Sequence, residues 1–265
     1  MSDTARQPTA IDTSKPHPAR MYDWFLGGKD NYPVDWAAAE EVQKLFPQVP
    51  ELARANREFM HRASRTLAQL GIRQFLDIGT GIPTRPNLHQ VVQAAAPECG
   101  VVYVDNDPIV LRHAQALLSS SPEGGTAYIQ ADAREPRKIV EAARELLDFT
   151  QPVALSMVAL LHFVPDEDHA YDVVRELLDP LPAGSCLVLS HATADVDPDT
   201  WHAVVDVYRR GGTHVQVRSR AEFAKFFAGL DLLEPGIRFV TDWRPDTTGR
   251  QQGERLPLYA AVGRK

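Results

Sequence analysis

The apolar residues of this chain recur at two spacings, and each spacing predicts a different element. From Glu51 to Leu70, apolar side chains follow one another at intervals of three and four, as on one face of an α-helix. The segment "GVVYVD" (100–105) is instead an almost continuous apolar run, which is typical of a strand buried on both sides. The chain is therefore expected to combine helices with a buried sheet.

Strand-like and helical segments alternate from residue 71 onward. Strands are expected at residues 73–79, 100–105, 126–132, 152–157 and 185–191. Helical patterns are expected between them, around residues 88–95, 108–118, 139–147 and 169–178. This alternation predicts an α/β fold with five parallel strands.

The end of the chain follows another pattern. A helix is expected from Pro198 to Tyr208, and Ser219 with Glu222 forms a capping box for a second one. Two further strand candidates, "DLLEPGIRFV" and "LPLYAAVG", have no helix between them. They are therefore expected to pair antiparallel at one edge of the sheet.

The part of the chain before the sheet divides in two. Residues 1–20 are rich in Thr, Ser, Pro and Ala and are expected to form a disordered tail. Residues 21–70 contain the long helical pattern and a shorter one from Val34 to Leu45, so a helical cap is expected there. Residues 71–265 are expected to form the sheet domain.

Composition and charge limit the class of protein. Apolar residues make up 44% and charged residues 24% of the 265 residues, as in soluble globular proteins. The net charge of -7 offers no general basic field for a phosphate backbone, so nucleic acid is disfavoured as a partner. The two cysteines, Cys99 and Cys186, lack the spacing of a metal site or of a disulfide framework.

Membrane and export segments are not expected. The longest apolar run, Val153 to Val164, is too short to cross a bilayer. Residues 1–20 lack the apolar core of a signal peptide. A cytoplasmic protein without a membrane partner is the expectation.

The turn "DIGTGIP" after the first strand is the first candidate for ligand binding. It begins like a dinucleotide-binding loop, with Gly79 and Gly81, but Thr84 stands at the position of the third glycine. Asp77 places a carboxylate beside the loop, and Pro83 removes an amide that would donate to a pyrophosphate. Both features disfavour a phosphate ligand, and a plain tight turn is the alternative interpretation.

S-adenosylmethionine suits this turn better, because it carries an ammonium group and a sulfonium but no phosphate. The carboxylate of Asp77 can attract the ammonium. Gly79 and Gly81 let the backbone approach the ligand closely.

The next two strands also end in acidic residues. Asp105 closes the second strand, where its carboxylate can accept hydrogen bonds from a ribose diol, and Asn106 follows at the place for adenine. Asp132 and Ala133 end the third strand, where an acceptor would meet the adenine amino group. A structural cap is the alternative role for Asp132. Three acidic strand ends in succession indicate a cofactor site.

These motifs resemble those of the class I S-adenosylmethionine-dependent methyltransferases. "FLDIGTG", "VVYVDNDP" and "IQADAREP" occur in that order within residues 71–265. "RMYDWFLGGKDNYPVD", "VALLHFVPD" and "GSCLVLSHAT" are similar to one bacterial family of this class, formerly a domain of unknown function. The resemblance implies a Rossmann-like, mostly parallel sheet of seven strands in the order 3-2-1-4-5-7-6, here preceded by the N-terminal helical extension.

The resemblance also implies the cofactor contacts. It assigns the methionine end, the adenosine and the adenine to these residues in turn: Asp77, Gly79 and Gly81; Asp105 and Asn106; Asp132 and Ala133. After the fourth strand the chain has "SMVALLHF" and lacks the Asp/Asn-Pro-Pro-aromatic motif, so adenine or amide nitrogen is disfavoured as the acceptor. Cys99 precedes the second strand and is misplaced for a cytosine C5 nucleophile.

An alcohol or phenol acceptor needs a base as well as in-line positioning. His162 and His191 follow the fourth and fifth strands, on the rim where an acceptor would lie, and are the candidates for that base. A hydrogen-bonded structural role is the alternative for each. No set of Asp, Glu and His residues has metal-ligand spacing, so no metal is expected.

The aromatic segment "RMYDWFLGGKDNYPVD", which precedes the sheet, has two interpretations. Its pair Gly27-Gly28 can act as a hinge, and polar groups follow directly at Lys29, Asp30 and Asn31. In the first interpretation, residues 20–35 are a lid that closes over the methionine end of the cofactor. In the second, the aromatic side chains only anchor the segment on the domain.

A closed lid would bring further residues to the site. Tyr22 or Tyr32 would line the acceptor pocket, and Arg57 of the long helix would lie near the carboxylate of the cofactor. The expected function is S-adenosylmethionine-dependent methylation of a small molecule, with a hydroxyl group as the candidate acceptor. Two alternatives stay open, namely a protein that binds the cofactor without transferring its methyl group and an NAD-dependent oxidoreductase.

Overall fold

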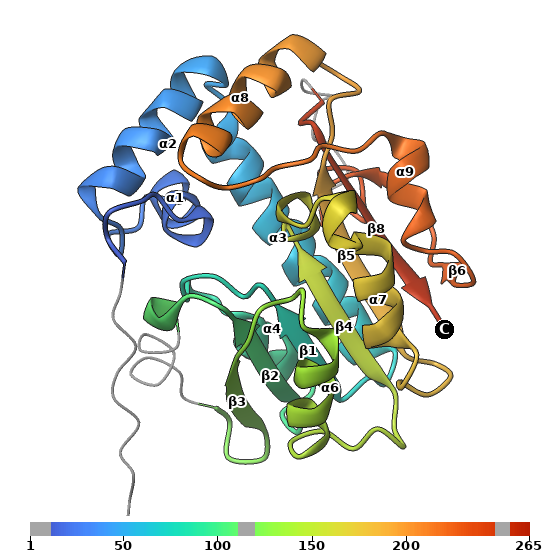
Figure 1. The fold of residues 1–265 in the computed structure, drawn as a ribbon. Helices are drawn as coiled ribbons and strands as arrows, with labels where there is room; N and C mark the ends of the chain where they lie inside the picture. The colour runs from blue at the N-terminus through green and yellow to red at the C-terminus, as the bar shows by residue number, and fades with distance from the viewer. Residues whose placement is uncertain (1–11, 111–119, 247–254) are drawn as a thin grey trace, which may run out of the picture.

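The computed structural model describes residues 12–110, 120–246 and 255–265 and has a mixed sheet at its centre. Its strands follow the order β3-β2-β1-β4-β5-β8-β6, with β7 also paired to β8 (Figure 1). The strands are β1 (Gln74–Ile78), β2 (Gly100–Asp105), β3 (Gly125–Gln130), β4 (Val153–Val158), β5 (Cys186–Ala192), β6 (Asp231–Leu232), β7 (Arg238–Phe239) and β8 (Leu258–Arg264).

Strands β1 to β5 are parallel and β8 is antiparallel to β5, which confirms the predicted arrangement. The predicted strand 231–240 is divided into β6 and β7, which both pair antiparallel with β8. Gly236 lies between them with a φ of 75°, and its amide donates to the carbonyl of Leu233, so the chain turns there. If β6 and β7 are counted as one strand, the order is the expected 3-2-1-4-5-7-6.

Apart from α1, for which no helix was predicted, the helices agree with the sequence patterns to within a few residues. They are α1 (Pro18–Phe25), α2 (Pro33–Leu45), α3 (Val49–Gln69), α4 (Leu88–Ala95), α6 (Pro136–Arg144), α7 (Ala170–Leu178), α8 (Pro198–Arg210) and α9 (Arg220–Lys225), with 3-10 turns η1 (Leu161–Phe163) and η2 (Asp166–Asp168). The capping box of Ser219 and Glu222 is present at the start of α9. Most of the helix predicted after Asp107 lies outside the described residues.

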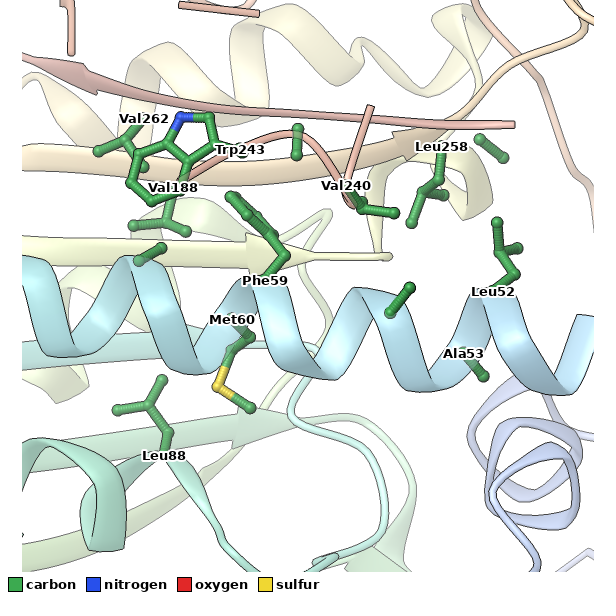
Figure 2. Close-up of a cluster of buried hydrophobic side chains, with 14 of the residues drawn as sticks. Leu52, Ala53, Phe59, Met60, Leu88, Val188, Val240, Trp243, Leu258 and Val262 are labelled. Carbon is green, nitrogen blue, oxygen red and sulfur yellow. The ribbon is translucent and has the colours of Figure 1, made fainter. Parts of the chain in front are cut away.

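Strands β1, β2, β4, β5 and β8 are buried on both sides because their side chains alternate between two apolar clusters. Phe75 of β1 belongs to the cluster beneath α3 and α4, whereas Leu76 and Ile78 belong to the cluster beneath α6 and α7. Figure 2 shows α3 crossing the first face, with Phe59 against Trp243 and Val188. The rings of Phe59 and Trp243 meet edge to face, with centroids 5.4 Å apart.

The N-terminal segment is ordered earlier than predicted. Helix α1 begins at Pro18, inside the expected tail, and Arg20 donates to the carbonyl of Asp12 at 3.0 Å. Residues 1–11 of that prediction lie outside the described residues. Helices α1, α2 and α8 lie together beyond the ends of the central strands (Figure 1). In the described parts of the chain, no helix combines the length and the apolar character needed to cross a membrane.

Candidate functional site

A cavity of about 520 Å³ lies where the parallel strands end. On the sheet side, its lining comes from the residues that follow β1, β2, β3 and β4. On the opposite side, its lining comes from α3 and from α1, α2 and α8, of which the last three lie beyond these strand ends in Figure 1. Open parallel sheets bind their ligands at this place.

The turn after β1 requires glycine at one position and leaves space at another. Gly79 has a φ of 72°, and a Cβ there would lie 2.6 Å from Cδ1 of Leu160. Gly81 has a φ of 67°, and a Cβ there would meet nothing within 4 Å. Because both glycines line the cavity, the turn offers bare backbone to a ligand at Gly81.

Asp105 ties the ends of β1 and β2 together. Its Oδ2 accepts a hydrogen bond from the amide of Gly81 at 2.8 Å, and its Oδ1 accepts one from the amide of Asp107 at 2.9 Å. Burial raises the pKa of the Asp105 carboxyl. Each carboxylate oxygen keeps a second lone pair, so Asp105 can also accept from a ligand. Asn106 follows it in the cavity lining and is exposed.

Asp77 and Arg57 bring opposite charges to one part of the cavity. Asp77 of β1 is buried, and this burial raises the pKa of its carboxyl to about 6, against the effect of nearby Arg57. Arg57 of α3 donates through Nη2 to the carbonyls of Thr84, at 2.6 Å, and Pro86, at 2.9 Å. These bonds hold the guanidinium against the turn after β1. A ligand with an adjacent ammonium and carboxylate would find a partner for each group.

Asp132 is engaged with a residue of its own turn. Its Oδ1 accepts from Nε of Arg134 at 2.9 Å and its Oδ2 from Nη2 at 2.6 Å. These hydrogen bonds hold the pKa of Asp132 below its ordinary value. Arg134 also lies 3.4 Å from Asp168. Asp132, Ala133 and Arg134 all line the cavity, and Arg134 was not among the predicted site residues.

The two candidate histidines have different surroundings. His162 lines the cavity, and its buried Nδ1 has no hydrogen-bond partner among the described residues. Burial lowers the pKa of His162 well below its ordinary value, so the imidazole is neutral at pH 7. His191 lies outside the lining, its Nδ1 donating to the carbonyl of Ala192 at 2.7 Å and its Nε2 accepting from Arg218 at 2.7 Å. Of the two predicted histidines, His162 is therefore the one that lines the cavity.

Arg218 holds the segment after β4 in place. Its fully buried guanidinium donates to the carbonyls of Leu161, at 2.9 Å, and Val164, at 3.0 Å, and pairs with Asp166 at 2.6 Å. This segment carries His162, so Arg218 positions the candidate base indirectly. Sequence analysis missed it because it lies in an irregular stretch between α8 and α9.

Of the predicted lid, residues 20–35, the described structure places Tyr22 and Phe25 in the cavity lining, and Tyr22 is the one of these two that was predicted as a site residue. The hydroxyl of Tyr22 donates to the carbonyl of Ala53 at 2.9 Å and accepts from Nδ2 of Asn56 at 2.9 Å. The other predicted lid residues lie outside the lining: Lys29, Asp30, Asn31 and Tyr32.

Two aspartates explain why the Gly-Gly turn faces away from the cavity. Oδ2 of Asp23 accepts from the amide of Asp30 at 2.9 Å and from Nδ2 of Asn31 at 2.8 Å. Oδ2 of Asp35 accepts from the amide of Tyr32 at 2.8 Å. The polar groups after the glycines thus complete the connection between α1 and α2.

The start of α1 reaches the cavity instead. His17 lines it, and Nδ1 of His17 lies 3.3 Å from Oδ2 of Asp107. Nε of Arg20 lies 3.3 Å from the same oxygen, and Nη1 of Arg20 lies 3.5 Å from Asp35. Asp107 also accepts from the amide of Ile109 at 2.9 Å, at the start of the next helix. Sequence analysis missed His17 because it assigned residues 1–20 to a tail.

The half of the cavity away from the sheet is apolar. Six buried side chains line this part, which we name the apolar chamber: Phe25, Val42, Phe46, Leu52, Trp201 and Val204. The rings of Phe46 and Trp201 lie 6.1 Å apart and join the end of α2 to α8. The chamber thus combines residues from near both ends of the chain.

Other chemistry is not apparent at the cavity. Cys99 and Cys186 are buried thiols outside the lining. Within residues 12–110, 120–246 and 255–265, no group of three or more His, Cys, Asp or Glu residues is placed to hold a metal ion.

Close relatives of known structure match this chain over nearly its whole length. A DUF574 family protein from Streptomyces avermitilis MA-4680 is 50% identical, with a TM-score of 0.93 over 97% of this chain and 100% of the other. A protein from Thermobifida fusca YX, provisionally assigned as a methyltransferase, is 36% identical, with a TM-score of 0.89 over 99% of each chain. Among curated proteins, none matches significantly.

A distant structural match supports the fold alone. It is an S-adenosylmethionine-dependent methyltransferase from Anabaena variabilis ATCC 29413, at 12% identity and a TM-score of 0.50 over 98% of this chain and 99% of the other.

The family follows from a match along the sequence. A family model described as S-adenosyl methyltransferase matches residues 4–265. The chain therefore belongs to the S-adenosylmethionine-dependent methyltransferases, and S-adenosylmethionine is its cofactor.

Proposed function

We propose that this chain transfers the methyl group of S-adenosylmethionine to a hydroxyl group of a small molecule, with His162 as the base. The observation that carries this proposal is the position of His162. Its neutral imidazole lines the same cavity as the cofactor-side residues and the apolar chamber. A hydroxyl acceptor in the chamber would thus meet a proton acceptor beside the cofactor.

The sheet side of the cavity fits the methionine end of the cofactor. Asp77 would hold the ammonium and Arg57 the carboxylate, because the two side chains present opposite charges close together in a buried place. Gly81 leaves the space that a ligand needs to approach the backbone. Gly79 is needed to keep this turn clear of Leu160.

The adenosine end would be held by the turns after β2 and β3. Asp105 would accept hydrogen bonds from the ribose hydroxyls, beside Asn106. Asp132 keeps acceptor capacity beyond its bonds to Arg134 and would receive the adenine amino group, with Ala133 next to it.

The bound cofactor supplies an activated methyl group on a positively charged sulfur. His162 would take the proton of the acceptor hydroxyl at a ring nitrogen while that oxygen takes the methyl group. The imidazolium then carries the positive charge that leaves the sulfur, so the net charge of the cavity does not change. A neutral imidazole is required at the start, and the lowered pKa of His162 provides it.

The two alternative functions are an NAD-dependent oxidoreductase and a protein that binds S-adenosylmethionine without transferring its methyl group. A nicotinamide cofactor would bring a pyrophosphate close to the Asp77 carboxylate, which repels it. A protein that binds S-adenosylmethionine without transfer would have the same cofactor contacts and differs in turnover alone.

A matched set of acceptors tests the proposal. Release of S-adenosylhomocysteine is measured with 2-naphthol, 2-(aminomethyl)naphthalene and 2-naphthoate, which share one ring system. We expect turnover of 2-naphthol above the other two, because the cavity offers a base for a hydroxyl group. Faster turnover of the amine would contradict a hydroxyl acceptor. Binding of S-adenosylhomocysteine without turnover of any compound would favour a protein that only binds the cofactor.

His162→Gln tests the base directly. We expect kcat to fall about a hundredfold or more, while the Kd for S-adenosylhomocysteine stays unchanged. His214→Gln is the control, because His214 lies at the exposed rim of the same cavity, 3.1 Å from Glu167. Equal losses of kcat in both variants, or an unchanged kcat in His162→Gln, would remove His162 from the chemistry.

A further inference from the structure

We propose that the apolar chamber selects an uncharged, ring-bearing acceptor, which enters with its apolar body and presents its hydroxyl group to His162. This inference rests on the proposed function and adds the class of substrate to it. It concerns the side of the cavity that the cofactor contacts do not use, which is built by α1, α2 and α8 together with the start of α3.

The distribution of charge in the cavity excludes a charged acceptor body. The residues that α1, α2 and α8 contribute to the lining are all uncharged. The charged side chains of the lining belong to the cofactor side, as with Asp77 and Arg57, or to the rim at η2, as with Glu167 and Asp168. A carboxylate or ammonium in the chamber would lose its hydration without gaining a partner, which is costly.

The walls of the chamber favour rings over chains. Phe46 and Trp201 lie with their ring centroids 6.1 Å apart, and the ring of Phe25 lines the same part of the cavity. Flat aromatic walls gain more from an offset or edge-on ring than from a flexible alkyl chain, since a ring loses little conformational freedom on binding. A compact ring system is therefore the favoured occupant.

Tyr208 offers this acceptor a polar anchor in the cavity that His162 also lines. It lies in the last turns of α8, and its hydroxyl has no hydrogen-bond partner among the described residues. The ring of Phe163 contacts both side chains, with its centroid 4.3 Å from that of His162 and 5.7 Å from that of Tyr208. The hydroxyl of Tyr22 differs, because Ala53 and Asn56 already bind it. Tyr208 thus acts as a positioning residue for the acceptor.

The test measures binding of 2-naphthol by calorimetry in the presence of S-adenosylhomocysteine. We expect 2-naphthol to bind at least tenfold more tightly than 2-naphthoate, which has the same rings and a charge, and than the linear alcohol 1-octanol. Val204→Phe fills the chamber and is expected to weaken 2-naphthol at least tenfold, with an unchanged Kd for S-adenosylhomocysteine.

Two further variants complete the design. Val205→Phe is the matched control, because it makes the same change at the next position of α8, outside the lining. Val42→Phe fills the chamber from α2 and serves if Val204→Phe does not fold. Tyr208→Phe should weaken 2-naphthol about fivefold and leave naphthalene unchanged, because the Tyr208 hydroxyl would donate to the naphthol oxygen, which naphthalene lacks, while the naphthol proton points to His162.

The outcomes separate the two proposals. If the protein binds S-adenosylhomocysteine but binds 2-naphthoate or 1-octanol as tightly as 2-naphthol, the inference is overturned and the proposed function stands. The same holds if both filled variants keep the affinity of the original chain. If 2-naphthol does not bind at all, the inference is overturned, and the turnover of this compound expected from the proposed function fails with it. If S-adenosylhomocysteine itself does not bind, the proposed function fails first.

Discussion

The two halves of the cavity are assembled in different ways. On the cofactor side, the acidic groups lie at or just after the strand ends that position them, as Asp105 ends β2 and Asp132 comes two residues after β3. On the acceptor side, Phe46 and Trp201 lie far apart in the sequence and meet only because α2 packs against α8. Cofactor chemistry is therefore encoded locally, whereas acceptor selection depends on the packing of distant helices.

This difference predicts that substitutions in the two halves of the cavity will have separate effects on binding. Changes at the strand ends should alter the affinity for the cofactor, because they remove charges and backbone conformations that the ligand needs. Changes that fill the chamber should alter the affinity for the acceptor alone. Four experiments test this difference between the two halves of the cavity.

The largest effect is expected where a single residue holds the acceptor side together. Arg218→Leu should lower the free energy of unfolding by about 3 kcal/mol, because it removes the buried partner of His191, of two carbonyls and of Asp166. Urea unfolding measures it. Arg175→Leu is the control, since Arg175 forms only an exposed ion pair with Asp172 and should change stability by less than about 0.5 kcal/mol. An equal loss of stability in both variants would show that Arg218 does not stabilise this part of the protein.

The cofactor side is tested by Asp105→Ala. Loss of the carboxylate leaves the ribose hydroxyls without an acceptor, so binding of S-adenosylhomocysteine should weaken by about 2 kcal/mol or more. Calorimetry on the folded variant gives the Kd. An unchanged Kd would place the adenosine elsewhere and break the comparison on its cofactor side.

Two glycines of one turn separate stability from binding. Gly79→Ala should lower stability by about 2 kcal/mol, because its φ is 72° and its Cβ would lie 2.6 Å from Leu160. Gly81→Ala carries only the strain of its φ of 67°, about 1 kcal/mol, but its methyl group would occupy open space at the cavity. Thermal unfolding and calorimetry compare them. A Gly81→Ala variant that binds S-adenosylhomocysteine normally would show that the ligand does not approach this backbone.

The smallest effect concerns pH and Asp77. Because the cofactor's ammonium binds the ionised carboxylate and the pKa of Asp77 is raised to about 6, affinity should fall about tenfold between pH 7 and pH 5. For the protein without ligand the sign is opposite. The raised pKa means that the contribution of Asp77 to stability is present below the unfolded value and is lost as the pH rises through about 6. Asp77→Asn should bind weakly with no such pH dependence, and an unchanged pH profile would place the ammonium away from Asp77.

Much of the fold could be predicted from the sequence because its signals are local. The apolar runs of β1, β2, β4 and β5 and the three- and four-residue spacing of α3 mark buried elements wherever they occur. The division of residues 231–240 into β6 and β7 was missed, since the turn at Gly236 interrupts a run of strand formers. The start of α1 was missed because its proline-rich context resembles that of a tail.

The site was predictable only where the sequence places chemistry next to a strand. The residues Asp77 to Gly81 and Asp105 meet this condition, and they gather around one cavity. His191 also lies near the end of a strand, but its hydrogen bond with Arg218 depends on tertiary packing that no local pattern shows. The chamber residues Phe46 and Trp201 have the apolar pattern of any buried helix face, so their meeting was not visible before folding.

The polar residues after the Gly-Gly pair illustrate the same limit. The sequence left two interpretations open for the segment with Lys29 to Tyr32, a lid hinged at the glycines and an anchor on the domain. In the structure, Asp23 and Asp35 bind this turn, while His17 and Tyr22 from α1 line the cavity. Hydrogen exchange should therefore show protection by S-adenosylhomocysteine at residues 17–25 more than at residues 27–32.

A crystal structure with S-adenosylhomocysteine and 2-naphthol tests the two-part cavity most directly. We predict that the homocysteine ammonium lies within hydrogen-bond distance of Asp77, and that the naphthol rings lie between Phe46, Trp201 and Val204 with the hydroxyl group at His162. Naphthol rings bound outside the chamber, or a homocysteine group away from Asp77 and Arg57, would contradict the division of the cavity into a cofactor half and an acceptor half.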